Sequence, residues 1–176
     1  MDTVQAILDF NAGRDPERLA LKYQAMRASP ARFARGSCHL FYARLPEHGS
    51  WLADPQVWCC GDAHLENFGS YRGDNGLVYF DLNDFDEATL APLSWDVLRT
   101  LSSVWLFAPD MKASPEDAQA LAQAFLTAYN DALASGKARW VERDTADGLV
   151  GDLLHAVRDR THPAFLDERT TLVGTR

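Results

Sequence analysis

The segment Cys59–Ala88, CCGDAHLENFGSYRGDNGLVYFDLNDFDEA, combines the pattern of a β-hairpin with a high density of side-chain oxygens. Residues 57–62 form an apolar run that ends in Gly-Asp, which is typical of a buried strand. The runs 67–71 and 77–83 flank RGDNG, whose Asp-Asn-Gly favours a tight turn. We therefore expect a strand, a loop and a hairpin that returns Asp84 to the end where Asp62 and Asn67 lie.

This set of oxygens suits phosphoryl transfer with magnesium. Such a site needs one carboxylate that orients or deprotonates the accepting hydroxyl, and a second carboxylate and an amide oxygen that hold the ion. Magnesium prefers hard oxygen ligands and keeps several waters, so two protein ligands suffice. Asp62, Asn67 and Asp84 supply this set. The simpler alternative is that Asp62 and Asn67 only cap turns, since both residue types commonly bond to loop backbone.

The sequence on either side of the hairpin favours helices. Their start and stop signals predict helices from Asp15-Pro16, from Ser29-Pro30 with a weak point at Gly36, over 93–108, from the capping box Ser114–Asp117 to Gly136, and over about 148–160. Residues 166–176 carry no capping or core signal and are predicted to be a flexible tail. The order of helices, one hairpin and more helices predicts an α+β fold that is mainly α.

The segment GDAHLENFGSYRGDNGLVYFDLNDFDEA also resembles a known superfamily. It is similar to the catalytic loop, hairpin and metal-binding segment of aminoglycoside-phosphotransferase-like and choline-kinase-like enzymes, which belong to the protein-kinase-like superfamily. The run LSWDVLRTLSS, residues 93–103, resembles the helix that follows in those enzymes. Together with RASPARFARG at 27–36, the whole pattern resembles a bacterial family known as domain of unknown function 2252, over about residues 20 to 110.

The resemblance implies a role for each matching residue. Asp62 would be the catalytic aspartate, Asn67 a metal ligand and Asp84 the principal metal ligand, with Mg²⁺ as cofactor and ATP as co-substrate. Asp81 is the alternative to Asp84, because its shorter spacing from Asp62 suits a short hairpin. The wording DFDEA and the twelve residues to Asp96 favour Asp84. Asp96 would brace the catalytic loop from the following helix.

Other polar and aromatic residues have less specific interpretations. His64 is expected to orient the loop by hydrogen bonds or to act as a ligand, and Asp86 either contacts a second metal or belongs to an acidic surface turn. The cations Arg27, Arg32 and Arg35 either bind phosphate, form a solvated helix face or supply a counter-charge to the acidic loop. Cys59 and Cys60 lie in an apolar run and are expected to pack rather than react. The tryptophans are expected in the core, at positions Trp51, Trp58, Trp95 and Trp105.

One part of the superfamily pattern is not evident. Those enzymes place a glycine-rich lobe over the phosphates, with a lysine that pairs with them, before the catalytic loop. The residues before Asp62 contain no glycine-rich strand–turn–strand, and their sole lysine is Lys22 on a predicted helix. We therefore expect a kinase-like C-lobe that is incomplete without a nucleotide-binding lobe, with self-association through the surface where that lobe would dock.

This interpretation divides one helical domain, 1–176, into regions. They are the N-terminal helices 1–55, the catalytic loop and hairpin 56–90, a helical bundle 91–165 and the tail 166–176. The chain length of 176 residues fits one domain.

The net charge of the chain argues against some classes of partner, and its cysteine content indicates a cellular compartment. The net charge is −8, and residues 51–100 carry nine Asp and Glu against two Arg, counted from the sequence. Such a field repels nucleic acid and anionic membranes, so neither is expected as a partner. We expect a cytoplasmic protein for three reasons. The odd number of cysteines, three, suits a reducing compartment, the N-terminus shows no signal pattern, and no apolar run is long enough to span a bilayer.

Three functions are consistent with these patterns. The first is a magnesium- and ATP-dependent phosphotransferase that acts on a hydroxyl of a small molecule or a protein. The second is a metal-dependent phosphoesterase, suggested by the Asp-x-His of GDAH but without the downstream histidine motifs that such enzymes need. The third is a non-catalytic kinase-like module that binds a partner or a nucleotide.

Overall fold

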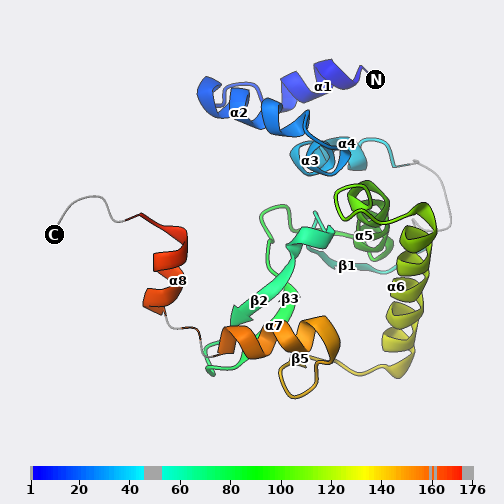
Figure 1. The fold of residues 1–176 in the computed structure, drawn as a ribbon. Helices are drawn as coiled ribbons and strands as arrows, with labels where there is room; N and C mark the ends of the chain where they lie inside the picture. Colours follow the sequence, from blue (N-terminus) through cyan, green and yellow to red (C-terminus); the bar gives the residue numbers. More distant parts are fainter. Residues whose placement is uncertain (1, 46–52, 159, 161, 172–176) are drawn as a thin grey trace. The chain divides into compact units, whose positions relative to one another are not determined.

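The chain divides into two compact units. The computed structural model describes residues 2–45, 53–158, 160 and 162–171. The first unit comprises Met1–Asn67 and Asp84–Lys137, and the second comprises Phe68–Asn83 and Ala138–Arg176. The structure is α+β and mainly helical with two small antiparallel sheets, as predicted (Figure 1).

Four short helices begin the first unit: α1 (Thr3–Phe10), α2 (Pro16–Met26), α3 (Pro30–Gly36) and α4 (Cys38–Tyr42). The predicted starts of α2 and α3 are confirmed, because the side chains of Asp15 and Ser29 accept hydrogen bonds from backbone N–H groups of the first turn. Helix α3 ends at Gly36, the predicted weak point. A Cβ there would lie 2.5 Å from Cγ of Met26, so α2 and α3 approach closely at this glycine. Helix α1 was not predicted.

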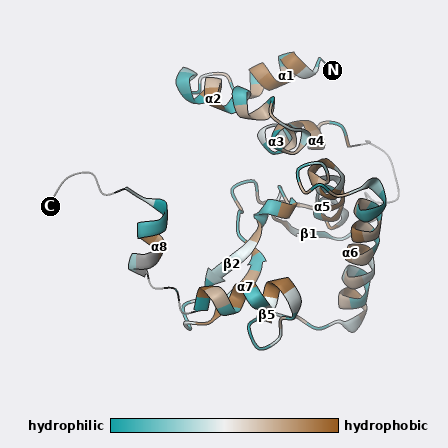
Figure 2. Cartoon of the chain, viewed as in Figure 1, coloured by the Kyte–Doolittle hydropathy of each residue, from teal (hydrophilic) through white to brown (hydrophobic). Residues whose placement is uncertain are grey.

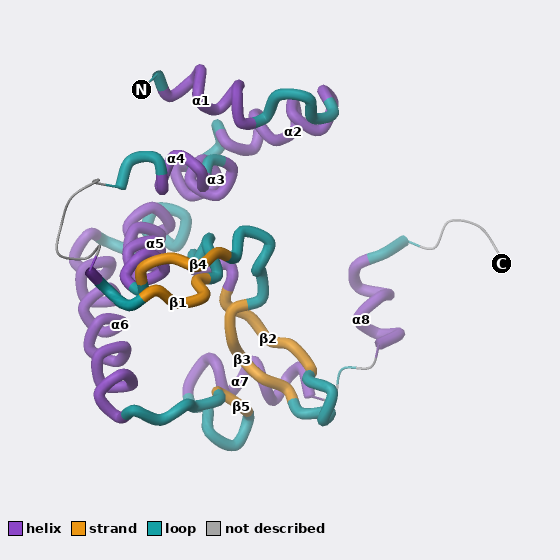
Figure 3. The backbone as a smooth tube through the Cα atoms, turned by 180° about the vertical axis from the view of Figure 1, so that it is seen from behind, coloured by secondary structure: helices purple, strands orange, loops and turns teal. Residues whose placement is uncertain are grey.

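A two-stranded sheet is formed by one strand before the candidate loop and one strand after it. Strand β1 (Gln56–Cys59) pairs antiparallel with β4 (Thr89–Pro92), with Cys59 opposite Thr89. Figure 3 shows the two strands side by side. The 3-10 turn η2 (Leu65–Asn67) follows the loop. The sequence predicted β1 but not its partner, because TLAP is too short and mixed to register as a strand.

Two longer helices complete the first unit: α5 (Ser94–Phe107) and α6 (Pro115–Ser135). The capping box at Ser114 is present, and Gly136 ends α6 in the left-handed conformation with φ of +61°, both as predicted. A core cluster of Val104, Ala108 and Ala118 joins the helices. The hydropathy of α6 alternates along its length, and several of its apolar side chains remain exposed (Figure 2).

The second unit consists of the hairpin and two helices. Strands β2 (Phe68–Arg72) and β3 (Val78–Leu82) pair with Phe68 opposite Leu82, which confirms the predicted hairpin, and β5 (Val141–Glu142) adds to β3. Helix α7 (Gly148–Arg158) buries Leu154 completely. The expected bundle over 91–165 is therefore divided, with α5 and α6 in the first unit and α7 in the second.

The prediction of a flexible tail over 166–176 is wrong for its first residues, which belong to helix α8 (His162–Arg169). An ion pair between Arg160 and Glu168 at 2.7 Å and the guanidinium of Arg169 over the Phe165 ring stabilise this helix. Neither an ion pair nor a cation–π contact forms a capping or core pattern in the sequence, so the sequence analysis did not predict this helix. Residues 172–176 lie outside the described residues.

The prediction that the tryptophans form core is also wrong for two of them. Trp58 is 80% exposed and Trp105 is 46% exposed, because each lies on the outward side of a strand or helix that buries only one face. Trp95 is half-buried against the ring of Tyr42, and Trp51 lies outside the described residues.

Among the described residues, no helix combines the length and the apolar composition that a membrane-spanning segment needs.

Candidate functional site

A glycine sets the path of the loop that follows β1. Gly61 has a φ of +88°, in the left-handed region that side chains rarely adopt. A Cβ on Gly61 would lie 1.9 Å from the backbone oxygen of Glu87. The loop over 61–67 and the acidic turn over 84–88 can therefore approach each other only because residue 61 lacks a side chain.

One face of α5 holds the loop backbone. The carboxylate of Asp96 accepts hydrogen bonds from the N–H of Cys60 at 2.7 Å and from the N–H of Gly61 at 3.1 Å. The hydroxyl of Thr100 donates to the carbonyl of Ala63 at 3.1 Å. A turn further along, the hydroxyl of Ser103 accepts from the N–H of Leu65 at 3.1 Å. Asp96 thus occupies the position that the family resemblance assigns to a bracing aspartate.

Asp62 is held by an arginine that the sequence analysis missed. Arg99 is 2% exposed, and its Nε and Nη2 lie 2.7 and 2.6 Å from Oδ1 of Asp62. Nη2 also donates to the carbonyl of Ala34, at 2.9 Å. A signal existed in the sequence, because a lone arginine in the apolar run of α5 requires a buried partner. The pair leaves Oδ2 as the oxygen of Asp62 that can act on a ligand.

Asn67 closes the loop through its amide nitrogen. Nδ2 donates to the backbone carbonyl of Asp62 at 2.8 Å, and the residue is 7% exposed. Its Oδ1 has no hydrogen-bond partner among the described residues. The nitrogen therefore fixes the loop while the oxygen stays available as a hard ligand.

His64 is buried beside Asp62, and neither of its ring nitrogens makes a hydrogen bond to any other residue that the structure describes. Its Nε2 lies 3.7 Å from Oδ2 of Asp62, its Nδ1 is buried and unpaired, and its ring stacks on Phe107 at 5.8 Å. Burial lowers the pKa of His64 below its ordinary value of 6.5, against the opposing effect of Asp62. The ring is therefore neutral at pH 7.

The buried histidines predict a loss of stability in acid. Above pH 6.5 the folded and unfolded states both hold neutral imidazole, whereas below it the unfolded state binds the proton first, so the free energy of unfolding falls. We expect His64→Gln to reduce this fall by up to about 1.4 kcal/mol per pH unit below pH 6.5. Urea unfolding at several pH values measures the slope. His39→Gln is the matched variant, since burial also lowers the pKa of His39. An unchanged slope in His64→Gln would contradict the assignment.

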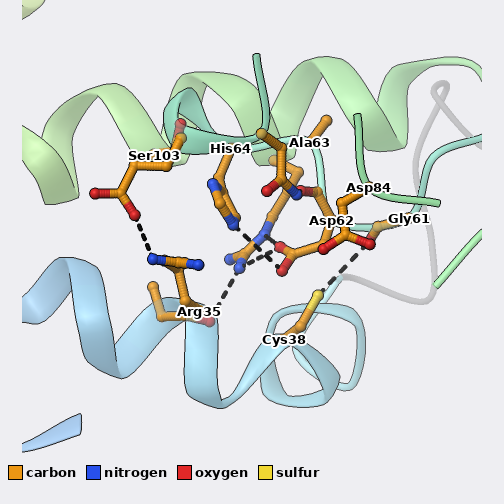
Figure 4. Close-up of polar contacts among 12 residues, drawn as sticks. Arg35, Cys38, Gly61, Asp62, Ala63, His64, Asp84 and Ser103 are labelled. Carbon is orange, nitrogen blue, oxygen red and sulfur yellow. Dashed lines mark hydrogen bonds and ion pairs between the residues drawn. The ribbon is translucent and has the colours of Figure 1, made fainter. Parts of the chain in front are cut away.

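A polar cavity of about 380 Å³ lies at the loop. Its acidic lining comprises Asp62, Asp84, Asp86 and Glu87, and its cationic lining comprises Lys22, Arg32 and Arg35. Figure 4 shows Asp62 and Asp84, with His64 beside Asp62 and Arg35 approaching from α3. One oxygen of Asp84 accepts a hydrogen bond from the N–H of Asp86 at 3.2 Å, so the acidic turn is locally ordered.

The donor set of this cavity fits a hard cation better than a soft one. Among the described residues, no group of three His, Cys, Asp or Glu side chains is placed to hold a metal ion. Oxygens without strong partners remain on Asp62 and Asp84, which line the cavity, and on Asn67, which is bonded to the Asp62 backbone but is not part of the lining. Two or three such oxygens match magnesium, which keeps several of its waters.

The remaining expected site residues lie elsewhere. Arg27 lines a separate apolar cavity with Val4, Leu8 and Phe33. Asp81 lies on β3 in the second unit, where its carboxylate accepts from the N–H of Leu82 at 2.8 Å.

The cysteines near the loop are packed. Cys38, Cys59 and Cys60 are free and buried. Burial raises the pKa of the Cys38 thiol to about 12 and that of Cys60 to about 11. Both remain protonated at pH 7, so neither is an activated nucleophile.

Comparison with known proteins gives a single result. Neither curated proteins nor solved structures give a match. The family described as uncharacterized protein conserved in bacteria (DUF2252) matches residues 14–176, which include the whole loop, its bracing helix and the cationic lining of the cavity. The chain is therefore a member of the DUF2252 family of uncharacterized proteins conserved in bacteria.

Proposed function

We propose that this chain is the catalytic segment of a kinase-like phosphotransferase, which uses magnesium and ATP to phosphorylate a hydroxyl of a small molecule or a protein. The observation that carries the proposal is that Asp62 and Asp84 line the same cavity as three cations, while Asn67 bonds to the backbone of Asp62. Phosphoryl transfer requires carboxylates, a divalent ion and cations around one phosphate.

Each residue has a distinct role in this proposal. Asp62 accepts the proton of the attacking hydroxyl through Oδ2, because Arg99 occupies Oδ1 and fixes the orientation of the carboxylate. Asp84 and Oδ1 of Asn67 would hold magnesium, with Asp86 beside them. The bound ion would neutralise charge on the phosphates during transfer.

The finer fold assignment, a kinase-like C-lobe, belongs to the same proposal. The order of a strand, a braced loop, a hairpin and a following helix supports it, because Asp96 of that helix bonds to the loop backbone. Kinase-like enzymes cover the nucleotide with a glycine-rich strand–turn–strand. The glycine that lines this cavity, Gly36, instead ends helix α3. The proposal therefore includes a nucleotide-covering lobe outside the described first unit.

A second candidate, a non-catalytic kinase-like binding module, is supported by one observation. The ion pair with Arg99 gives Asp62 a structural role that requires no chemistry. A module of this kind would bind a nucleotide or a partner at the same cavity and transfer nothing.

Magnesium-dependent nucleotide binding separates these proposals from an inert scaffold. We expect Mg-ATP at about 100 times its Kd to stabilise the chain by about 2.7 kcal/mol, which raises Tm by about 5–10 °C for a chain of this size. Asp84→Asn should remove the shift, and Asp81→Asn tests the alternative ligand. Differential scanning fluorimetry measures both. A shift that survives Asp84→Asn would refute the metal assignment.

Turnover then distinguishes the enzyme from the binding module. Asp62→Asn should lower the rate of phosphate release or transfer from ATP by about 10²–10⁴ while the thermal shift with Mg-ATP remains. A Mg-ATP shift without turnover in the wild type would favour the non-catalytic module.

A further inference from the structure

Lys22 on α2 is held at the cavity by a hydrogen bond to the buried side chain of Asn11. Its Nζ donates to Oδ1 of Asn11 at 2.9 Å, and Asn11 is 0% exposed. The amide nitrogen of Asn11 donates in turn to the carbonyl of Ile7 at 2.7 Å, at the end of α1. Both ends of the Asn11 amide are therefore used, and the lysine has a fixed position.

In the described part of the chain the charge of Lys22 is paired with no carboxylate, and its Nζ lies over the ring of Phe10, 5.9 Å from the ring centroid. The ion pairs found there do not include Lys22, although Asp84, Asp86 and Glu87 line the same cavity. A neutral glutamine could make the bond to Asn11 without the cost of desolvating a charge. A half-buried ammonium that is fixed in place and lacks a carboxylate partner can form strong, charge-assisted hydrogen bonds to an anion.

The surroundings of Lys22 point the same way. Burial and the neighbouring Arg14 lower its pKa, while Glu87 raises it, and Lys22 in turn lowers the pKa of His39. Arg32 also lines the cavity and forms no ion pair among the described residues, whereas Arg35 is paired with Glu66. Two cations are therefore unneutralised across from the carboxylates.

We propose that Lys22, positioned by Asn11, forms with Arg32 an anion-binding wall that holds phosphate groups in this cavity. The identification of those phosphates as the nucleotide's rests on the proposed function. On this view a helical lysine, and not one from a glycine-rich lobe, neutralises the transferred phosphates. Lys22 and Arg32 contact the ligand, and Asn11 is a positioning residue.

Binding of inorganic pyrophosphate without metal tests the wall. Isothermal titration of the wild type should give saturable binding, and Lys22→Gln should weaken it by about tenfold. Arg32→Gln should weaken it by several-fold. Arg27→Gln is the matched control, because Arg27 lines a separate apolar cavity, and its Kd should equal that of the wild type. No binding to the wild type, or equal loss in Arg27→Gln, would overturn the proposal.

The positioning role of Asn11 needs a readout other than affinity. Reductive methylation with ¹³C labels the three lysines, Lys22, Lys112 and Lys137, together with the α-amino terminus, and the Lys22 signal is the one that Lys22→Gln lacks. Pyrophosphate should raise the pKa of Lys22 and leave the other signals unmoved. In Asn11→Ala the free-state pKa of Lys22 should change, because its ammonium loses the acceptor that fixes it, while pyrophosphate binds several-fold more weakly. An unchanged Lys22 titration in folded Asn11→Ala would refute the positioning role.

Asp84→Asn separates this inference from the proposed function. Loss of a carboxylate across the cavity should tighten metal-free pyrophosphate binding by a few-fold, even as it removes the Mg-ATP shift. If pyrophosphate binding depends on Lys22 but Mg-ATP has no effect on any variant, the anion-binding wall is supported and the phosphotransferase proposal is refuted. If Lys22→Gln binds and turns over Mg-ATP as well as the wild type does, the anion-binding wall is refuted and the phosphotransferase proposal is supported.

Discussion

Arg99→Met destabilises the chain by about 3–5 kcal/mol, the range typical for removal of one partner from a buried ion pair. Arg99 is 2% exposed and supplies two nitrogens to Oδ1 of Asp62, so the substitution leaves a carboxylate desolvated and uncompensated. It also removes the donor to the carbonyl of Ala34 and the cation above the ring of Phe41. Urea unfolding at pH 7 measures the loss as a shift in midpoint at constant m-value.

A double-mutant cycle isolates the pair from the packing of the side chain. Arg99→Met combined with Asp62→Asn removes both charges, so the double variant should be more stable than Arg99→Met alone. Arg99→Lys, which keeps the charge but not the two-nitrogen geometry, should fall between the wild type and Arg99→Met. Additive losses in the double variant would show that the pair contributes no coupling energy.

Gly61→Ala destabilises the chain by about 2–5 kcal/mol and removes the Mg-ATP shift. The left-handed backbone costs about 1–2 kcal/mol for a residue with a Cβ, and an added methyl in a filled space costs about 1–3 kcal/mol more. The second cost arises because the Cβ would lie 1.9 Å from a backbone oxygen of Glu87, which cannot rotate away. The acidic turn must then separate from the loop that carries Asp62.

Gly13→Ala is the control for the backbone contribution. Gly13 has a φ of +79°, close to that of Gly61, but a Cβ there meets nothing within 4 Å. The difference between the two losses in free energy therefore measures the steric contact alone. Equal losses, with ligand binding intact in Gly61→Ala, would show that the loop and the turn can separate without consequence.

The sequence predicted the features that are encoded locally. The hairpin, the caps at Asp15 and Ser29, the capping box at Ser114 and the left-handed stop at Gly136 each depend on residues within a few positions of one another. The membership in the DUF2252 family was also visible, because the motifs that carry that resemblance are short and specific.

The contacts that define the site were beyond the sequence because they join distant residues. Arg99 and Asp62 are 37 positions apart, and Lys22 lies on α2 whereas Asn11 follows the end of α1. Helical periodicity marks which residues share a face but not which charge meets which. The exposure of Trp58 illustrates the same limit, since a short apolar strand does not reveal which of its faces is covered.

Four hydrogen bonds from Asp96, Thr100 and Ser103 of α5 hold the loop backbone on both sides of Asp62. Together with Arg99, they fix the carboxylate of Asp62 relative to the helix. On the cavity lining supplied by the N-terminal helices, Asn11 fixes the ammonium of Lys22, whereas the exposed side chain of Arg32 has no ion pair among the described residues. Arg32 is therefore the lining cation with the most freedom to adjust its position.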